Sequence, residues 1–86
     1  MSVGVPVEHQ PDQSRFTAQV EGQTAFLTYE RGTDVVAMTH TIVPRELEGR
    51  GIAGDLTRTA VQWARAQGLS IDAQCSYVRS WLQKNA

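Results

Sequence analysis

The amino-acid sequence predicts a small α+β domain with the element order β-β-β-α-β-α, in which an antiparallel meander and one parallel strand form a mixed sheet with two helices packed on it. Residues 14–43 contain three stretches with the alternating apolar and polar pattern of half-buried strands, joined by short turns. Residues 51–67 switch to the spacing of an amphipathic helix. At 86 residues, the chain suffices for one domain with a small core.

The meander is expected to contain strands at 14–20, 24–31 and 35–43. In the first strand, Phe16, Ala18 and Val20 share one face, as the two-residue repeat of a strand requires. The glycine-containing turns at 21–23 and 32–34 are short. Because short turns join only antiparallel neighbours, the three strands should lie side by side in chain order.

The second half of the chain supplies a helix, a strand and another helix. The long helix is expected at 51–67, about 25 Å at 1.5 Å per residue, with Gly68 as its cap. A short strand follows at 69–73. Because a strand, a helix and a strand in succession form a β-α-β unit, this strand should run parallel to 35–43. A closing helix, from Cys75 or Ser76 to Gln83, has apolar side chains at helical spacing.

Composition and charge argue against several function classes. The net charge of −1 and the absence of any run of Lys or Arg do not suit a nucleic-acid partner. The longest apolar run is about four residues, far short of a membrane span. Residues 1–13 lack the basic start and apolar core of a signal peptide, and we expect a flexible tail there before a domain at 14–86.

Cysteine and histidine usage gives two further expectations. The single cysteine, Cys75, cannot form an internal disulfide, which fits the reducing cytoplasm. His9, His40 and Cys75 are scattered, and no pair has the spacing of metal ligands. The sequence therefore predicts a cytoplasmic protein without a metal site.

The most informative stretch is the strand at 35–43 with the glycine turn and the helix that follow it. Pro44 ends the strand because proline has no N–H to donate. Gly49, Gly51 and Gly54 allow a tight turn and a close approach of the backbone to a ligand. Free N–H groups and the dipole at a helix N-terminus favour an anion, and phosphate is the obvious ligand. The turn matches neither nucleotide-binding fingerprint, and a purely structural connection is the alternative.

Three motifs in order give this stretch a family resemblance. They are His40-Thr41-x-Val43-Pro44, Glu46-x-x-Gly49-x-Gly51-Ile52-Ala53 and Cys75-Ser76-Tyr77-Val78. Together they resemble the very small, single-domain branch of the GCN5-related N-acetyltransferases (the GNAT family), over Phe16 to the C-terminus. The family signature begins with Arg or Gln, whereas this sequence has Glu46 at that position.

The resemblance implies a minimal GNAT-like fold that binds acetyl-CoA as co-substrate. Residues at the strand end would pair their backbone with the pantetheine arm: Thr41, Ile42 and Val43. Residues of the turn and helix start would hold the pyrophosphate: Glu48, Gly49, Arg50, Gly51, Ile52, Ala53 and Gly54. Because Arg45 and Arg50 are offset by Glu46 and Glu48, phosphate binding should rest mainly on backbone N–H groups, with the arginines as local donors.

Three residues are candidates for catalysis, each with a structural alternative. Cys75 begins a helix, where the dipole lowers a thiol pKa; otherwise it is a small buried residue. His40 lies mid-strand and is expected on the face of Val36, Met38 and Ile42, where it serves either as a base or as a core histidine. Tyr77 matches by order the tyrosine that protonates the departing CoA thiolate in many GNAT enzymes, or it packs in the core.

The function expected from this sequence is transfer of an acetyl group from acetyl-CoA to a primary amine. Direct attack by the amine and passage of the acetyl group through Cys75 both remain open. Larger GNAT members have helices before this core and strands after it that help grip the acceptor, so we expect an open site suited to an amine of a peptide or protein. The alternatives are a non-catalytic CoA-binding module and a plain protein-interaction domain. A core this small fits a monomer or a homodimer.

Overall fold

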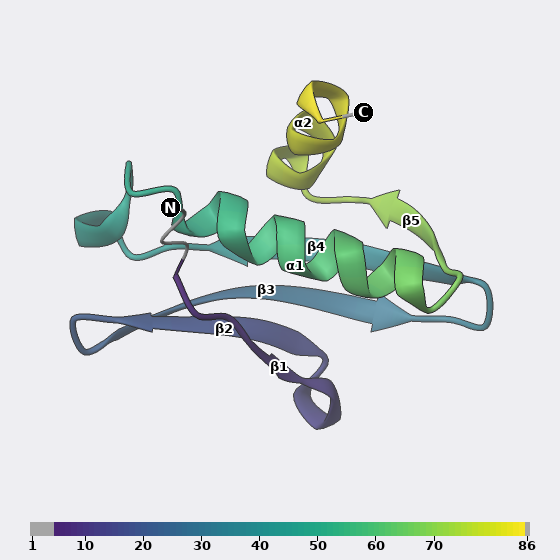
Figure 1. Cartoon of the computed structure of the whole chain (residues 1–86), viewed down its shortest axis with the longest axis horizontal. Coiled ribbons are helices and arrows are strands. Elements are labelled where there is room, and N and C mark those ends of the chain that lie inside the picture. Colours follow the sequence, from purple (N-terminus) through teal and green to yellow (C-terminus); the bar gives the residue numbers. More distant parts are fainter. Residues whose placement is uncertain (1–4, 86) are drawn as a thin grey trace.

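The computed structural model describes residues 5–85 and consists of a five-stranded sheet with a long helix across one face (Figure 1). The elements are β1 (Glu8–Gln10), η1 (Pro11–Gln13), β2 (Arg15–Val20), β3 (Gln23–Arg31), β4 (Val35–Ile42), η2 (Arg45–Leu47), α1 (Ile52–Ala66), β5 (Ser70–Ala73) and α2 (Ser76–Lys84), where η denotes a short 3-10 helix. The sheet order is β1-β2-β3-β4-β5. The first four strands pair antiparallel, and β5 pairs parallel to β4. The predicted α+β fold, the meander and the parallel last strand are confirmed.

The N-terminal segment differs from the flexible tail expected through Gln13. Glu8–Gln10 form β1, in which His9 pairs with Phe16 of β2. The imidazole stacks on the Phe16 ring with centroids 4.1 Å apart, and its Nε2 lies 2.7 Å from the Tyr29 hydroxyl oxygen. The folded domain therefore begins before residue 14. Residues 1–4 of the expected tail lie outside the described residues.

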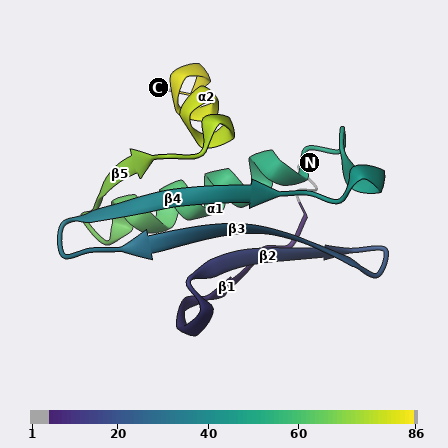
Figure 2. The ribbon, with the colours of Figure 1, turned by 180° about the vertical axis from the view of Figure 1, so that it is seen from behind.

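The core lies between α1 and the sheet face that it covers. Residues of α1 that are fully buried there repeat at helical spacing: Ile52, Leu56, Ala60, Val61 and Ala64. Helix α2 packs against α1, β4 and β5, with Val78 fully buried. Seen from behind, the opposite face of the sheet carries no helix among residues 5–85 (Figure 2). No helix in this part of the chain has the length and apolar character needed to cross a membrane.

Strand β4 contains one extra residue, which reverses the facing of the side chains that follow it. Met38 pairs with Tyr29, whereas His40 pairs with the preceding residue of β3, Thr28, so that Thr39 is accommodated as a β-bulge. Before the bulge, Met38 faces α1 and is fully buried. After it, the residues that face α1 are odd-numbered instead of even-numbered.

The bulge also marks the place where β4 and β5 separate. Their parallel pairing ends at Met38 and Ala73, and the amides of Gln74 and Cys75 both donate to the Met38 carbonyl, at 3.1 and 3.0 Å. Within residues 5–85, the edge of β4 beyond Met38 has no further strand partner. The fold thereby leaves an open strand edge directly before the glycine turn.

Candidate functional site

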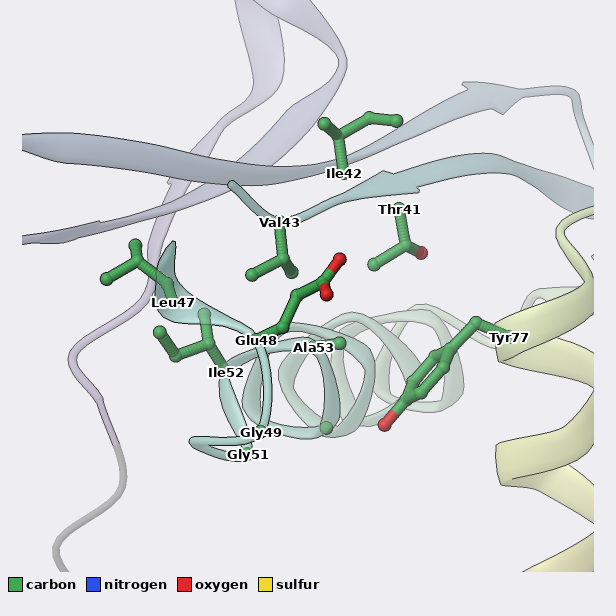
Figure 3. A pocket seen from close by; sticks show the side chains of 11 residues that line it. Thr41, Ile42, Val43, Leu47, Glu48, Gly49, Gly51, Ile52, Ala53 and Tyr77 are labelled. Atoms are coloured by element: carbon green, nitrogen blue, oxygen red, sulfur yellow. The ribbon is translucent and has the colours of Figure 1, made fainter. Parts of the chain in front are cut away.

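A cleft of about 650 Å³ lies between the end of β4, the loop after it, the start of α1 and the first turn of α2 (Figure 3). Its lining residues are Thr41, Ile42, Val43, Leu47, Glu48, Gly49, Gly51, Ile52, Ala53, Gly54 and Tyr77. This set contains every residue of the predicted cofactor-binding segment except Arg50. The fold therefore gathers that segment around one cavity, and its coenzyme-binding role stays a prediction.

The loop before α1 lines the cleft, and its backbone N–H groups at residues 49–51 have no acceptor in the described part of the chain. The first backbone hydrogen bond of α1 runs from the Asp55 amide to the Gly51 carbonyl, at 3.0 Å. In the described part of the chain, the amides of residues 49–54 have no hydrogen-bond acceptor. Such amides at a helix N-terminus bind anions. The loop can therefore hold a phosphate through its backbone alone.

Two glycines of this loop have backbone conformations that disfavour other residues. Gly49 has φ +85° and Gly51, the residue before α1, has φ +79°. A Cβ at either position would meet no atom within 4 Å, so steric crowding by neighbouring atoms does not explain why these residues are glycine. The reason is the left-handed backbone, which places Cβ too close to the following carbonyl in L-residues.

The side chains of β4 that face the cleft are those that follow the bulge. Thr41 and Val43 point toward α1, whereas Ile42 points away from the cleft (Figure 3). The side chain of Ile42 lies on the uncovered face of the sheet, with Ile42 as a whole 47% exposed. Ile42 therefore contributes backbone and not side chain to the cleft.

The position expected for His40 is wrong. We expected His40 on the face of Val36 and Met38, but the bulge turns it to the opposite face, where it pairs with Thr28 and is exposed. His40 does not line the cleft. Nothing in the strand sequence marks the extra residue, because threonine suits a regular strand.

Cys75 adjoins the cleft at the N-terminus of α2. Its Sγ lies 3.5 Å from the Thr41 Oγ1, and the residue is half-buried. Burial raises the pKa of the Cys75 thiol, but hydrogen bonds from the Thr41 hydroxyl and from the backbone of Val78, Tyr77 and Thr41 outweigh it, so the net pKa is lowered. The predicted effect of the helix terminus agrees with this environment.

Tyr77 forms the wall of the cleft opposite the loop. Its hydroxyl lies 3.5 Å from the place where a Cβ of Gly54 would stand, so the phenol rests against the first turn of α1. Tyr77 is 41% exposed, and its side chain is directed across the cleft (Figure 3). It is therefore a cleft residue and not the core residue of the structural alternative.

The charged side chains of the loop are arranged unfavourably for an anion. Arg50 forms an ion pair with Glu21 of the β2–β3 turn, at 2.7 Å between Nη1 and Oε2. The hydrogen bond from Arg50 lowers the pKa of the Glu21 carboxyl. The Glu48 carboxylate instead points into the cleft (Figure 3). The expectation that Arg50 donates locally to phosphate is therefore not supported by its side-chain position.

Leu47 is a lining residue that our sequence analysis did not include. It is fully buried in η2 and forms part of the apolar lining of the cleft. A single leucine between two glutamates, Glu46 and Glu48, was a signal that this loop folds back onto the core. Among residues 5–85, no group of three or more His, Cys, Asp or Glu side chains could hold a metal ion.

The fold and the cleft together define a class of protein: a single α+β domain in which a strand end, a glycine loop and a helix N-terminus line one cleft. Residues 15–86 match the model of the GCN5-related N-acetyltransferase family. The chain belongs to this family, and its fold is a minimal GNAT-like fold.

The chain is also similar to curated vertebrate proteins named NATD1. The protein of Gallus gallus is 32% identical over 84 residues, which cover 94% of this chain and 76% of the relative. The protein of Homo sapiens is 32% identical over 84 residues, covering 94% and 74%. The protein of Danio rerio is 30% identical over 88 residues, covering 99% and 80%.

Proposed function

We propose that this protein binds acetyl-CoA in the cleft and transfers the acetyl group to a primary amine. The observation that carries the proposal is the run of backbone amides at residues 49–54, which have no acceptor in the described structure and lie in the loop before α1 and in its first turn. Membership of the GNAT family supports it. The lone thiol suits a reducing compartment, so we extend the proposal to the cytoplasm.

The chain offers separate contacts for two parts of the coenzyme, the pyrophosphate and the pantetheine arm. The loop amides suit the pyrophosphate, and the open edge of β4 at Thr41–Val43 suits the amide groups of the pantetheine arm, much as an added strand would pair there. The buried side chains of Leu47 and Ile52 give the cleft an apolar floor. A cavity of about 650 Å³ is of the size that binds ligands of this class.

Direct transfer assigns roles to two residues. The amine nitrogen attacks the thioester carbonyl carbon, the carbon–sulfur bond breaks, and Tyr77 donates its hydroxyl proton to the released thiolate. The proton lost by the amine passes to solvent or to His40. Because His40 lies on the uncovered face of the sheet, it can act as base only for an acceptor that approaches from that face.

Passage through Cys75 is the second route. The Cys75 thiolate attacks the thioester carbon, the bond from that carbon to the CoA sulfur breaks, and CoA leaves as a thiolate that takes a proton from solvent. The amine then attacks the carbonyl carbon of the acetyl-cysteine, which releases the Cys75 thiolate and gives the proton of the amine to solvent. The lowered pKa of the thiol favours this route. Mass spectrometry after mixing with acetyl-CoA in the absence of an amine separates the two: one acetyl group on Cys75 indicates this route, and an unmodified chain indicates direct transfer.

An exposed amine on a peptide or protein is the acceptor that we favour. The face of the sheet that carries His40 is not covered by any helix in residues 5–85 (Figure 2), so an amine carried by a large molecule can approach it. A lysine side chain or an N-terminal amine reaches such an open surface without a dedicated cavity.

Release of CoA thiol tests the proposal. The protein is mixed with acetyl-CoA and a lysine-containing peptide, and free thiol and peptide acetylation are both measured. We expect release above the enzyme-free rate, and we expect Tyr77→Phe to lower kcat more than it raises KM because its hydroxyl acts late in the reaction. Binding without release would favour the non-catalytic CoA-binding module, and failure to bind would leave a protein-interaction domain.

A further inference from the structure

The hydroxyl of Thr41 connects the cleft with the thiol of Cys75. Thr41 lines the cleft, and its Oγ1 lies 3.5 Å from the Cys75 Sγ. The backbone of Cys75 is held in place as well, because its amide donates a hydrogen bond to the Met38 carbonyl at 3.0 Å. The contact therefore joins the end of β4 to the start of α2, across the place where β4 and β5 separate.

The β-bulge is what makes this contact geometrically available. With regular alternation after Met38, residue 41 would face the uncovered side of the sheet, and residue 40 would face α1. The extra residue, Thr39, exchanges these positions. A bulge next to the cleft thus places a hydroxyl on the thiol side of β4 and the imidazole of His40 on the other side.

We propose that Thr41 is a positioning residue, whose hydroxyl holds the Cys75 sulfur beside the cleft and donates a hydrogen bond to its thiolate form. The use of that thiol in acetyl transfer rests on the proposed function. The hydroxyl–thiol interaction itself does not, since it requires no bound ligand.

The chemistry of the two groups fits this role. A neutral thiol donates its S–H to Oγ1, whereas a thiolate accepts the Thr41 O–H. A hydrogen bond to a charged group is stronger than one to its neutral form, so the hydroxyl favours the thiolate. It acts together with the backbone at Tyr77 and Val78, which lies at the N-terminus of α2.

Two substitutions at position 41 distinguish the effect of the hydroxyl from the effect of the side-chain shape. Thr41→Val keeps the branched shape that suits a strand and removes the hydroxyl, and Thr41→Ser keeps the hydroxyl and removes the methyl group. Thr39→Val is a matched control in the same strand. Its hydroxyl bonds to Thr28 Oγ1 at 2.7 Å and is not in contact with Cys75.

The test is the rate of Cys75 alkylation by iodoacetamide between about pH 5 and pH 10, which brackets the ordinary thiol pKa. For Thr41→Val we expect the midpoint of the rate profile to move to higher pH and the rate near pH 7 to fall roughly threefold or more. The plateau at high pH should be unchanged, because the thiolate is then fully formed in every variant. Thr41→Ser and Thr39→Val should follow the wild-type profile.

An unchanged midpoint in Thr41→Val would overturn the inference. A changed plateau with an unchanged midpoint would overturn it as well, since it would mean that Thr41 governs only access to the sulfur. Thermal unfolding monitors folding of each variant, and Thr41→Ala compared with Thr41→Ser replaces the pair if valine prevents folding. Because alkylation is measured without acetyl-CoA, the result is independent of whether the cleft binds that ligand.

Discussion

At the scale of single residues, a comparison of Gly51 with Gly22 distinguishes the effect of backbone strain from an effect on ligand binding. Gly51 and Gly22 have nearly the same left-handed conformation, φ +79° and +77°, and neither has an atom within 4 Å of a Cβ. Gly22 lies in the β2–β3 turn and does not line the cleft. The two positions therefore share the strain and differ in the amides that they present to a ligand.

We expect Gly51→Ala and Gly22→Ala each to lower the free energy of unfolding by about 1 kcal/mol, because both place a Cβ in the left-handed region. Only Gly51→Ala should also weaken acetyl-CoA binding, by roughly fivefold or more, since the loop amides lose their alignment. Urea unfolding and calorimetric titration measure the two effects. Equal affinities in both variants would argue against a backbone anion site.

Glu48 offers a second test at this scale. Its carboxylate points into the cleft and repels a phosphate there, while the side chain is exposed and can rotate toward solvent. We expect Glu48→Gln to bind acetyl-CoA roughly two- to fivefold more tightly at low ionic strength, with a smaller gain at high salt. Glu46→Gln, outside the cleft lining on the same loop, should change the affinity less. No gain in Glu48→Gln would place the phosphates elsewhere.

His40 and Thr41 show why sequence reasoning about single residues failed where it did. The motif placed both residues correctly at the end of β4, next to the glycine turn. The facing expected for His40 was wrong because it depends on the register between β4 and β3, and one extra residue reverses it. The glycine positions were predictable, because a left-handed backbone leaves a trace in residue type, whereas a bulge at Thr39 leaves none.

At the scale of elements, β1 contributes one side chain, His9, to an aromatic cluster. His9 stacks on Phe16, lies 2.7 Å from the Tyr29 hydroxyl oxygen, and contacts the edge of Trp63 with ring centroids 4.9 Å apart. The guanidinium carbon of Arg31 lies over the Trp63 ring, 5.6 Å from the ring centroid. Burial lowers the pKa of His9 below its ordinary value. The folded state therefore favours the neutral imidazole.

The lowered pKa of His9 makes the free energy of unfolding depend on pH. The unfolded chain binds a proton at His9 more readily than the folded chain does. The contribution of neutral His9 to the free energy of unfolding is therefore fully present above the unfolded pKa of about 6.5, and it is lost as the pH falls from there toward the folded pKa. We expect the wild-type free energy of unfolding to decrease between about pH 7.5 and pH 5.5. In His9→Gln the decrease should be smaller, whereas His40→Gln should keep the wild-type decrease. Equal slopes in all three proteins would contradict this account of β1.

Longer helices and strands could be predicted from the sequence, whereas the shortest strand could not. The bounds of β2, β3, β4, α1, β5 and α2 lie within about a residue of those expected, because each repeats its apolar residues often enough to show a period. Strand β1 has three residues and no period. It is held by pairing with β2 and by the contacts of His9 with Tyr29 and Trp63, and such contacts cannot be read from a short polar segment.

At the scale of the whole molecule, the sheet separates two surfaces with different roles in our account. One face is covered by α1 and carries the cleft, while the other is uncovered and carries His40 and Ile42 (Figures 1 and 2). The pairing of β4 with β5 ends at Met38, next to the residues of β4 that line the cleft. In our proposal, acetyl-CoA binds on the first face and the amine approaches from the second, so that the reacting groups meet at this opening.

The arrangement predicts that each ligand perturbs its own face. A lysine peptide added to the protein should shift the amide resonances of β4 residues on the uncovered side, such as His40 and Ile42, without shifting those of Gly49 and Gly51. The perturbation should be weak in the absence of acetyl-CoA, because an open surface offers few contacts. Shifts confined to the glycine loop would contradict an approach from the uncovered face.

The most direct test of the central claim, that the cleft binds acetyl-CoA, is a titration of the 86-residue protein followed by amide resonance shifts. The account predicts shifts concentrated at residues 41–43, at the loop amides of 49–54 and at the start of α2 around Cys75 and Tyr77. Unshifted loop amides at about millimolar acetyl-CoA, a concentration at which even weak sites fill, would contradict it.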